Sequence, residues 1–148
     1  MATNYIPAGC HAVTPYLTVP DARREVEFLV AAFGGEKREQ IHRPDGRIMH
    51  AQVVIRDSLL MIGEPPDPSH CMAFMLYHYV PDCDAVWKRA VDVGGEIVNE
   101  VTDMFYGDRV GAVKDPGGNT WWIATHKEEL TAGQIEERTA AMLSGSKK

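Results

Sequence analysis

Apolar and polar side chains alternate along two stretches of the chain, residues 13–19 and 73–80. Alternation with a period of two is typical of a half-buried β-strand, so we predict a strand in each stretch. Both strands end in a Val-Pro-Asp sequence, whose aspartate (Asp21 or Asp82) is suited to cap the start of a helix. Apolar residues then recur at helical spacing, and each predicted helix stops at a Gly-Gly pair. These apolar residues are Val26, Leu29 and Phe33 in the first helix and Val86, Ala90 and Val93 in the second.

Three further strand-like segments follow each of the two predicted helices. The order of elements is the same in both halves, and matching residues lie 60 to 62 positions apart, as Tyr77 does from Tyr16 and Gly94 from Gly34. A spacing this constant indicates an internal repeat. We therefore predict an α+β fold that contains two βαβββ repeats. The expected strands are residues 36–42, 48–55 and 58–62 in the first repeat and residues 96–101, 109–114 and 119–125 in the second.

The two repeats are expected to form one domain. We place this domain at residues 10–127, with the first βαβββ unit at 12–63, a proline-rich linker at 64–71 and the second unit at 72–126. Residues 128–148 follow as a polar helical tail. We interpret this tail, which carries Leu130, Ile135 and Met142, as a packing or dimerisation element rather than a catalytic one.

The composition argues against several classes of partner. The 148 residues carry a formal net charge of −6 and no basic face is evident, so a nucleic-acid partner is not expected. No apolar run approaches the roughly 20 residues that span a bilayer, and no signal peptide is evident. We therefore expect no membrane partner and a cytoplasmic location. The three cysteines lack Cys-x-x-Cys spacing, which argues against a disulfide framework or a zinc knuckle.

Two segments carry a resemblance to a known family. Asp45-Gly-Arg-Ile-Met-His50-Ala and the segment from Tyr106 to His126, which contains Asp115-Pro-Gly-Gly-Asn, resemble the PhnB-like branch of the vicinal oxygen chelate superfamily. This superfamily includes glyoxalases, bleomycin resistance proteins and extradiol dioxygenases. The resemblance covers about residues 12–127 and implies a curved mixed sheet with a cup-like cavity, and a homodimer in which paired units complete the cups. It does not determine a reaction, because the superfamily includes isomerases, dioxygenases, thiol transferases and drug-sequestering proteins.

The resemblance also locates the superfamily's metal site in this chain. In its metalloenzymes the ligands come from the first and last strands of each unit, and the matching residues here are Thr14, Leu60, Met75 and Trp122. None of them is a His, Glu, Asp or Cys, whereas a divalent metal ion needs three or four nitrogen, oxygen or sulfur ligands. A shift by one residue offers only side chains such as Met61. We therefore expect no metal and no cofactor in the cup.

Period-two alternation indicates which side chains line the cup instead. The apolar residues of the first and third strands are expected to face the helix, which leaves the polar and aromatic residues between them for the cup. The residues expected toward the helix are Val13, Leu17, Val19, Met49, Ala51, Val53 and Ile55. The candidate ligand-binding residues are Thr14, Tyr16, His50, Gln52, Met75, Tyr77, Phe105 and Trp122. Of these, Phe105 is expected at the rim of the cup.

Some of these residues have more than one interpretation. His50 could act as an acid or base or bind a ligand, since an ordinary histidine has a pKa of about 6.5, but it could equally be a bonded partner of Tyr77 or of a carboxylate. Trp122 could stack on a planar ligand or simply fill space. Arg47 and Arg109 occupy matching positions in the repeats, so a structural salt bridge common to both is the better interpretation.

Three functions remain open. The first is binding of a small, aromatic or amphipathic molecule in a metal-free cup. The second is a metal-independent enzyme of isomerase or lyase type that uses His50 as acid or base. The third, and least favoured, is a divalent-metal glyoxalase or dioxygenase with other ligands, such as His50 and Glu64. Binding is favoured over catalysis because His50 is the only titratable group expected in the cup, and acid–base catalysis commonly needs two.

Overall fold

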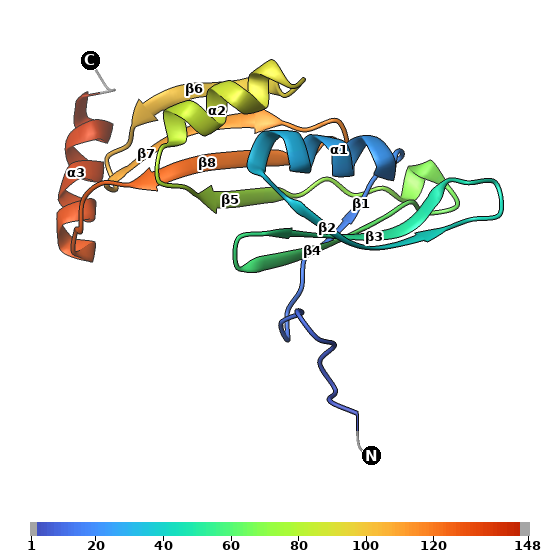
Figure 1. Cartoon of the computed structure of the whole chain (residues 1–148). Helices are drawn as coiled ribbons and strands as arrows, with labels where there is room; N and C mark the ends of the chain where they lie inside the picture. The colour runs from blue at the N-terminus through green and yellow to red at the C-terminus, as the bar shows by residue number, and fades with distance from the viewer. Residues whose placement is uncertain (1–2, 146–148) are drawn as a thin grey trace.

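The computed structural model describes residues 3–145, and Figure 1 shows two sheets that each carry a helix. Both halves run in the order β-α-β-β-β, which confirms the predicted α+β fold of two βαβββ repeats. The first module consists of β1 (Tyr16–Thr18), α1 (Ala22–Phe33), β2 (Glu36–His42), β3 (Ile48–Ile55) and β4 (Ser58–Gly63). The second module consists of β5 (Met75–Tyr79), α2 (Cys83–Asp92), β6 (Glu96–Asp103), β7 (Asp108–Lys114) and β8 (Thr120–His126).

The two sheets share one strand order. This order is β1-β4-β3-β2 in the first sheet and β5-β8-β7-β6 in the second. The first strand of each module runs parallel to the last, and the other neighbours are antiparallel. Consequently β1 and β5 lie at sheet edges, where one side of the strand has no partner in its own sheet.

Local sequence signals explain where the helices begin and end. The side chains of Asp21 and Asp82 cap α1 and α2, each by accepting a hydrogen bond from the backbone N–H three residues later. α1 ends at Gly34, whose φ of 68° lies in the left-handed region that favours glycine. A Cβ at Gly35 would lie 2.7 Å from Cγ1 of Val53, so the second glycine lets the chain pass close to β3.

The apolar core lies between each helix and the sheet that it covers. Leu17, Ala51, Val53 and Ile62 of the first sheet are fully buried, as the alternation predicts for the side facing α1. Ile123 has the same role in the second sheet.

Two residues predicted to face α1 lie elsewhere. Val13 is 89% exposed because β1 begins only at Tyr16. Met49 is 47% exposed, and Ile48 is buried in its place. The pairing of β2 with β3 is irregular at this end of the strands, so the alternation does not extend through it.

The two modules are joined through α1, which contacts α2 and lies next to it in Figure 1. The carboxyl group of Glu25 is fully buried and accepts a hydrogen bond from Gly117 N at 3.0 Å, in the turn before β8. It also shares a hydrogen bond with Asp115, which accepts another from Trp121 Nε1 at 2.8 Å. The ring of Phe33, at the end of α1, packs on that of Trp121 with centroids 4.8 Å apart. Each module therefore packs on the other through both polar and aromatic contacts.

Burial makes Glu25 a weak acid. Desolvation, followed by the hydrogen bond and the charge of Asp115, raises the pKa of Glu25 to about 10. Glu25 therefore keeps its proton at neutral pH, so the buried carboxyl pair carries one negative charge rather than two.

Arg47 and Arg109 form ion pairs at matching places in the two modules. Arg47 pairs with the buried carboxylate of Glu64, which also accepts a hydrogen bond from Ala22 N at 3.0 Å. Arg109 pairs with Asp84 at 2.8 Å. Ala22 begins α1, and Asp84 lies in the first turn of α2. Each arginine therefore pairs with a carboxylate that lies at the start of a helix, a structural role common to the repeats.

A third helix, α3 (Ala132–Gly145), follows the second module and lies at its end in Figure 1. Arg138 of this helix pairs with Glu128 at 2.8 Å and donates a hydrogen bond to the carbonyl oxygen of Phe105 at 3.2 Å. Residues 146–148 of the predicted helical tail lie outside the described residues. Within residues 3–145, no helix is both long and apolar enough to cross a membrane.

Candidate ligand-binding site

Each sheet has one face that packs on its helix and a second face, which we call the open face. The register of the strands shows which residues share it, because cross-strand neighbours point to the same side. In the first sheet Met61 is the neighbour of both Tyr16 and Gln52. In the second sheet Trp122 is the neighbour of Tyr77. These side chains therefore lie on the open faces, where the sequence predicts the cup.

The open faces carry large side chains that remain exposed to solvent. The exposed fraction is 41% for Tyr16, 69% for Met75, 38% for Tyr77 and 56% for Tyr79. Aromatic and apolar surface concentrated in this way is typical of a site that a ligand or another protein covers.

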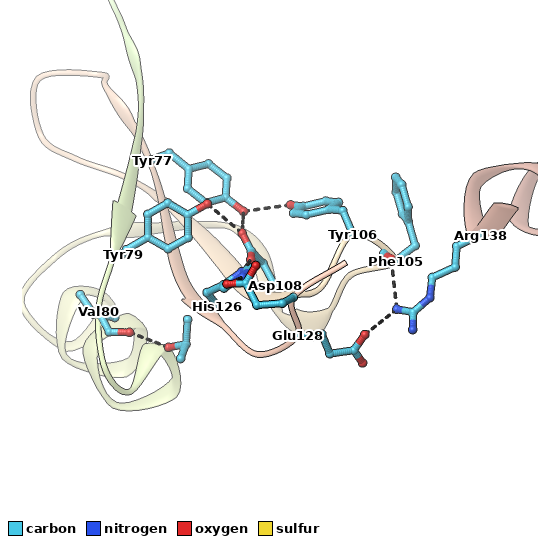
Figure 2. Close-up of polar contacts among 11 residues, drawn as sticks. Tyr77, Tyr79, Val80, Phe105, Tyr106, Asp108, His126, Glu128 and Arg138 are labelled. Atoms are coloured by element: carbon cyan, nitrogen blue, oxygen red, sulfur yellow. Dashed lines mark hydrogen bonds and ion pairs between the residues drawn. The ribbon is translucent and has the colours of Figure 1, made fainter. Parts of the chain in front are cut away.

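A hydrogen-bond network on the second sheet is centred on Asp108 (Figure 2). Asp108 begins β7 and is only 4% exposed. Its Oδ2 accepts hydrogen bonds from the hydroxyl groups of Tyr77 and Tyr79 at 3.0 and 3.1 Å. The hydroxyl of Tyr106 lies 3.0 Å from that of Tyr77, and Nδ1 of His126 lies 2.7 Å from Oδ1 of Asp108. One buried carboxylate thus orients three side chains around it.

The network also determines protonation states. Burial, followed by the hydrogen bonds of the network, raises the pKa of Tyr77, and burial followed by the hydrogen bond to Asp108 raises that of Tyr79. The hydrogen bond to Asp108 is the main cause that raises the pKa of His126. Both tyrosines therefore stay neutral and donate to the carboxylate. Each hydroxyl oxygen keeps lone-pair capacity to accept a hydrogen bond from a ligand.

Three members of this network, Tyr106, Asp108 and His126, are absent from the predicted cup. Two of them could have been found, because His126 continues the alternation that passes through Trp122, and Asp108 is its cross-strand neighbour. The strand predicted at residues 109–114 begins one residue after Asp108, and the strand predicted at 119–125 ends one residue before His126. The expectation that His50 is the only titratable group in the cup is therefore wrong.

On the first sheet, His50 is paired with Tyr16. The Tyr16 hydroxyl lies 3.3 Å from Nδ1 of His50, and the ring centroids are 5.7 Å apart. Gly63 makes room for this pair, because a Cβ there would lie 2.5 Å from the Tyr16 hydroxyl. The partner of His50 is therefore Tyr16 and not Tyr77, and Gln52 lies on the same strand face as His50.

Two predicted ligand-binding residues lie apart from these groups. Thr14 precedes β1, and its hydroxyl donates a hydrogen bond to the carbonyl oxygen of His11 at 2.8 Å, within a local turn. Phe105 packs edge-on against Tyr106, with ring centroids 5.2 Å apart. In Figure 2 the hydroxyl of Tyr106 points toward Tyr77, whereas the ring of Phe105 points away from the network. Tyr106 is thus the aromatic residue of this segment that reaches the open face.

The positions of the superfamily's metal ligands need one correction. Trp122 and Met75 lie on the open face of the second sheet, with Nε1 of Trp122 buried and lacking a partner among the described residues. Leu60, however, is 3% exposed and belongs to the core, so the register places Met61 on the open face. Within residues 3–145, no group of three or more His, Cys, Asp or Glu side chains is placed to hold a metal ion.

The alternative metal ligands His50 and Glu64 do not lie together. The carboxylate oxygens of Glu64 accept hydrogen bonds from Arg47 and Ala22 N, on the side of the sheet that faces α1. His50 lies on the open face, so the sheet separates the two side chains.

Two βαβββ modules with aromatic open faces define a protein of the vicinal oxygen chelate type. The family model for the Glyoxalase/Bleomycin resistance protein/Dioxygenase superfamily matches residues 10–123, and the chain belongs to this superfamily. The uncharacterized protein Mb0911c of Mycobacterium bovis is 30% identical over 148 aligned positions, which cover 92% of this chain and 94% of the relative.

Solved structures with the same fold include TioX from Micromonospora sp. ML1, with a TM-score of 0.68 and 24% identity over 78% of this chain and 98% of that one. The PhnB protein from Bacillus cereus has a TM-score of 0.62 and 15% identity over 78% of this chain and 99% of that one. TnmS3, an antibiotic binding protein from a Streptomyces species, has a TM-score of 0.60 and 20% identity over 79% of this chain and 98% of that one. At these identities the likeness shows a common fold.

Proposed function

We propose that this protein binds a small, aromatic or amphipathic molecule in a metal-free cup formed by its open faces. The observation that carries the proposal is the Asp108 network. It holds the exposed rings of Tyr77 and Tyr79 in fixed orientations next to Trp122. Such a surface offers flat apolar area for stacking and a few fixed polar atoms for orientation, the combination that small-molecule sites use.

A solved structure of the same fold supports this class of ligand. TnmS3 is described as an antibiotic binding protein, and its fold covers 79% of this chain. Thr14, Met61, Met75 and Trp122, at the superfamily's metal positions, supply no His or carboxylate ligand. Binding would therefore depend on stacking and hydrogen bonds.

We expect the cup to be completed by a second copy of the chain. The rings of Tyr77 and Tyr79 and the side chain of Met75 are too exposed in one chain to enclose a ligand. A second sheet placed over them would bury this surface and supply the opposite wall. Sedimentation velocity at the concentrations used for binding should therefore give twice the chain mass of 16.4 kDa. A monomer that binds ligand would contradict this arrangement.

Ligand binding can be tested through tryptophan fluorescence. We expect a screen of aromatic antibiotics and metabolites to yield compounds that quench emission, since Trp122 lies on the open face. Replacing Trp122 with phenylalanine should remove most of the quenching, whereas Trp87→Phe should not, because Trp87 lies on α2 and donates to Asn99 O at 3.1 Å. Equal quenching in the Trp122→Phe protein would argue that the ligand binds elsewhere.

The second candidate function is a metal-independent enzyme, and one observation favours keeping it. The open faces hold two histidines in oriented hydrogen bonds, His50 with Tyr16 on the first sheet and His126 with Asp108 on the second, so His50 is not the only titratable group available for acid–base chemistry. Nε2 of His126 is engaged by Glu129 at 3.0 Å, so His50 remains the better acid or base. If a bound compound is converted, His50→Ala should abolish turnover and retain binding, and unchanged turnover would remove His50 from the mechanism.

A further inference from the structure

A cavity of about 660 Å³ lies where the two modules meet, and Tyr77 and Tyr79 of the Asp108 network line one side of it. One wall is the turn between β3 and β4, and the other is β5, with apolar lining from Leu76 and from the core residues Leu60 and Trp121, each 3% exposed. We call this space the inter-module cavity. Its volume is within the range of cavities that hold small organic ligands.

His78 gives this cavity a polar group without a partner. Its ring packs edge-on against Phe33, with centroids 4.9 Å apart, and neither ring nitrogen has a hydrogen-bond partner among the described residues. Burial, followed by the charge of Arg56, lowers the pKa of His78. A neutral imidazole has one donor and one acceptor, and leaving both unpaired is costly. A ligand that turns this ring toward the cavity would satisfy one of them.

Arg56 places an unpaired positive charge at the same cavity. Its φ is 54°, and it is the one non-glycine residue among those described with a positive φ. No carboxylate in the described part of the chain forms an ion pair with it, although the neighbouring Asp57, which accepts a hydrogen bond from Ser58 Oγ at 2.9 Å, also lines the cavity. Glycine would adopt this turn without strain, and strained residues are concentrated at functional positions. An arginine at this strained position, without an ion-pair partner among the described residues, points to an anionic ligand.

The edge of β5 adds backbone donors. Phe74 and Val80 make their backbone hydrogen bonds to β8. In a parallel pair these bonds come from every second residue, so the backbone groups of Tyr77 and Tyr79 point away from β8 toward the cavity.

We propose that the inter-module cavity is a second ligand site, for a small amphipathic carboxylate that places its apolar body on Leu60, Leu76 and Trp121 and its carboxylate on Arg56. Charge, apolar surface and the unpaired imidazole lie together in one cavity, as such an acid requires. The site adjoins the cup through Tyr77 and Tyr79, but Arg56 and His78, which supply its charge and its imidazole, lie outside the Asp108 network.

The test is a calorimetric titration of the full chain with 2-naphthoate, a planar aromatic acid. Arg56→Gln should weaken binding about tenfold, the usual effect of losing one charge-assisted contact. Arg38→Gln removes an equally positive but distant side chain, 54% exposed on β2, and should change affinity by less than about twofold. Neutral 2-naphthamide should bind the wild type about tenfold more weakly than the acid does. An Arg56→Gln protein that binds 2-naphthoate like the wild type, or a wild type that does not bind it, would overturn the proposal.

Two further variants separate this site from the cup and from simple misfolding. Arg56→Gly should raise the Tm, because glycine relieves the positive φ, and still weaken 2-naphthoate binding about tenfold. Trp122→Phe should impair the cup ligand but not 2-naphthoate. If Trp122→Phe weakens 2-naphthoate as much as Arg56→Gln does, the acid binds in the cup and the second site is refuted.

Discussion

Replacing Glu25 with glutamine should stabilise the protein at neutral pH, and the gain should increase as the pH rises. Glu25 is fully buried, accepts a hydrogen bond from Gly117 N and shares one with Asp115. Glutamine has nearly the same shape, and its amide can make both contacts. Unlike the carboxyl group of Glu25, the amide does not have to bind a proton to remain neutral in the folded state.

The sign of this effect follows from the pKa of Glu25. Burial raises the pKa from 4.5 to about 10, so the folded state holds a proton that the unfolded chain releases above pH 4.5. The contribution of Glu25 to stability is therefore fully present below pH 4.5 and is lost as the pH rises toward 10. Each pH unit in this window costs about 1.4 kcal/mol, which amounts to about 3 kcal/mol at pH 7.

Urea unfolding from pH 5 to pH 9 measures this effect directly. The difference in unfolding free energy between Glu25→Gln and the wild type should increase with pH. Glu27→Gln is the matched control, since Glu27 lies on the same helix but is exposed, and its effect should stay within about 0.5 kcal/mol. A Glu25→Gln protein that is destabilised equally at every pH would show that Glu25 acts as an ionised group.

Asp108→Asn should weaken binding of the cup ligand by about ten- to a hundredfold, equivalent to about 1.4–2.8 kcal/mol. Tyr77 and Tyr79 both donate to Oδ2 of the carboxylate, and a neutral amide oxygen in its place is a weaker acceptor than a charged one. The two hydroxyls would then be held less firmly in the direction that the ligand meets. The same change should lower the pKa of His126, because the hydrogen bond to Asp108 is the main cause that raises it.

Both effects can be measured on one pair of proteins. Calorimetry reports the affinity for the compound found by fluorescence screening, and NMR titration reports the pKa of His126. Asp103→Asn is the matched control, because Asp103 is 79% exposed at the end of β6 and pairs with Arg109. If Asp108→Asn lowers the pKa of His126 but leaves affinity unchanged, the network is structural and the ligand does not depend on it.

The fold could be predicted from the sequence because its signals are local and occur twice. Val-Pro-Asp before each helix, Gly-Gly after it and a nearly constant repeat spacing determine the order of elements. Errors occur where the alternation ends, as at Val13 and Met49, since the ends of strands depend on pairing with neighbours. The assignment of residues 10–127 to a single domain stays a prediction.

The candidate site was predicted only in part, for reasons of register and long-range contact. Alternation correctly places Tyr16, His50 and Tyr77 on the open faces. For the superfamily's metal-ligand position on β4, the alignment of the repeats is shifted by one residue and selects Leu60. The strand register places Met61 on the open face instead. The role of Asp108 depends on tyrosines about 30 residues away in the chain, which no local pattern reveals.

The central proposal, an aromatic cup that binds without a metal, is tested most directly by calorimetry on protein treated with EDTA and checked by elemental analysis. We expect the compound found by screening to bind with the same Kd, within about twofold, before and after chelation and after addition of nickel, zinc, iron or manganese. Binding that is lost on chelation and restored by one of these metals would contradict the proposal.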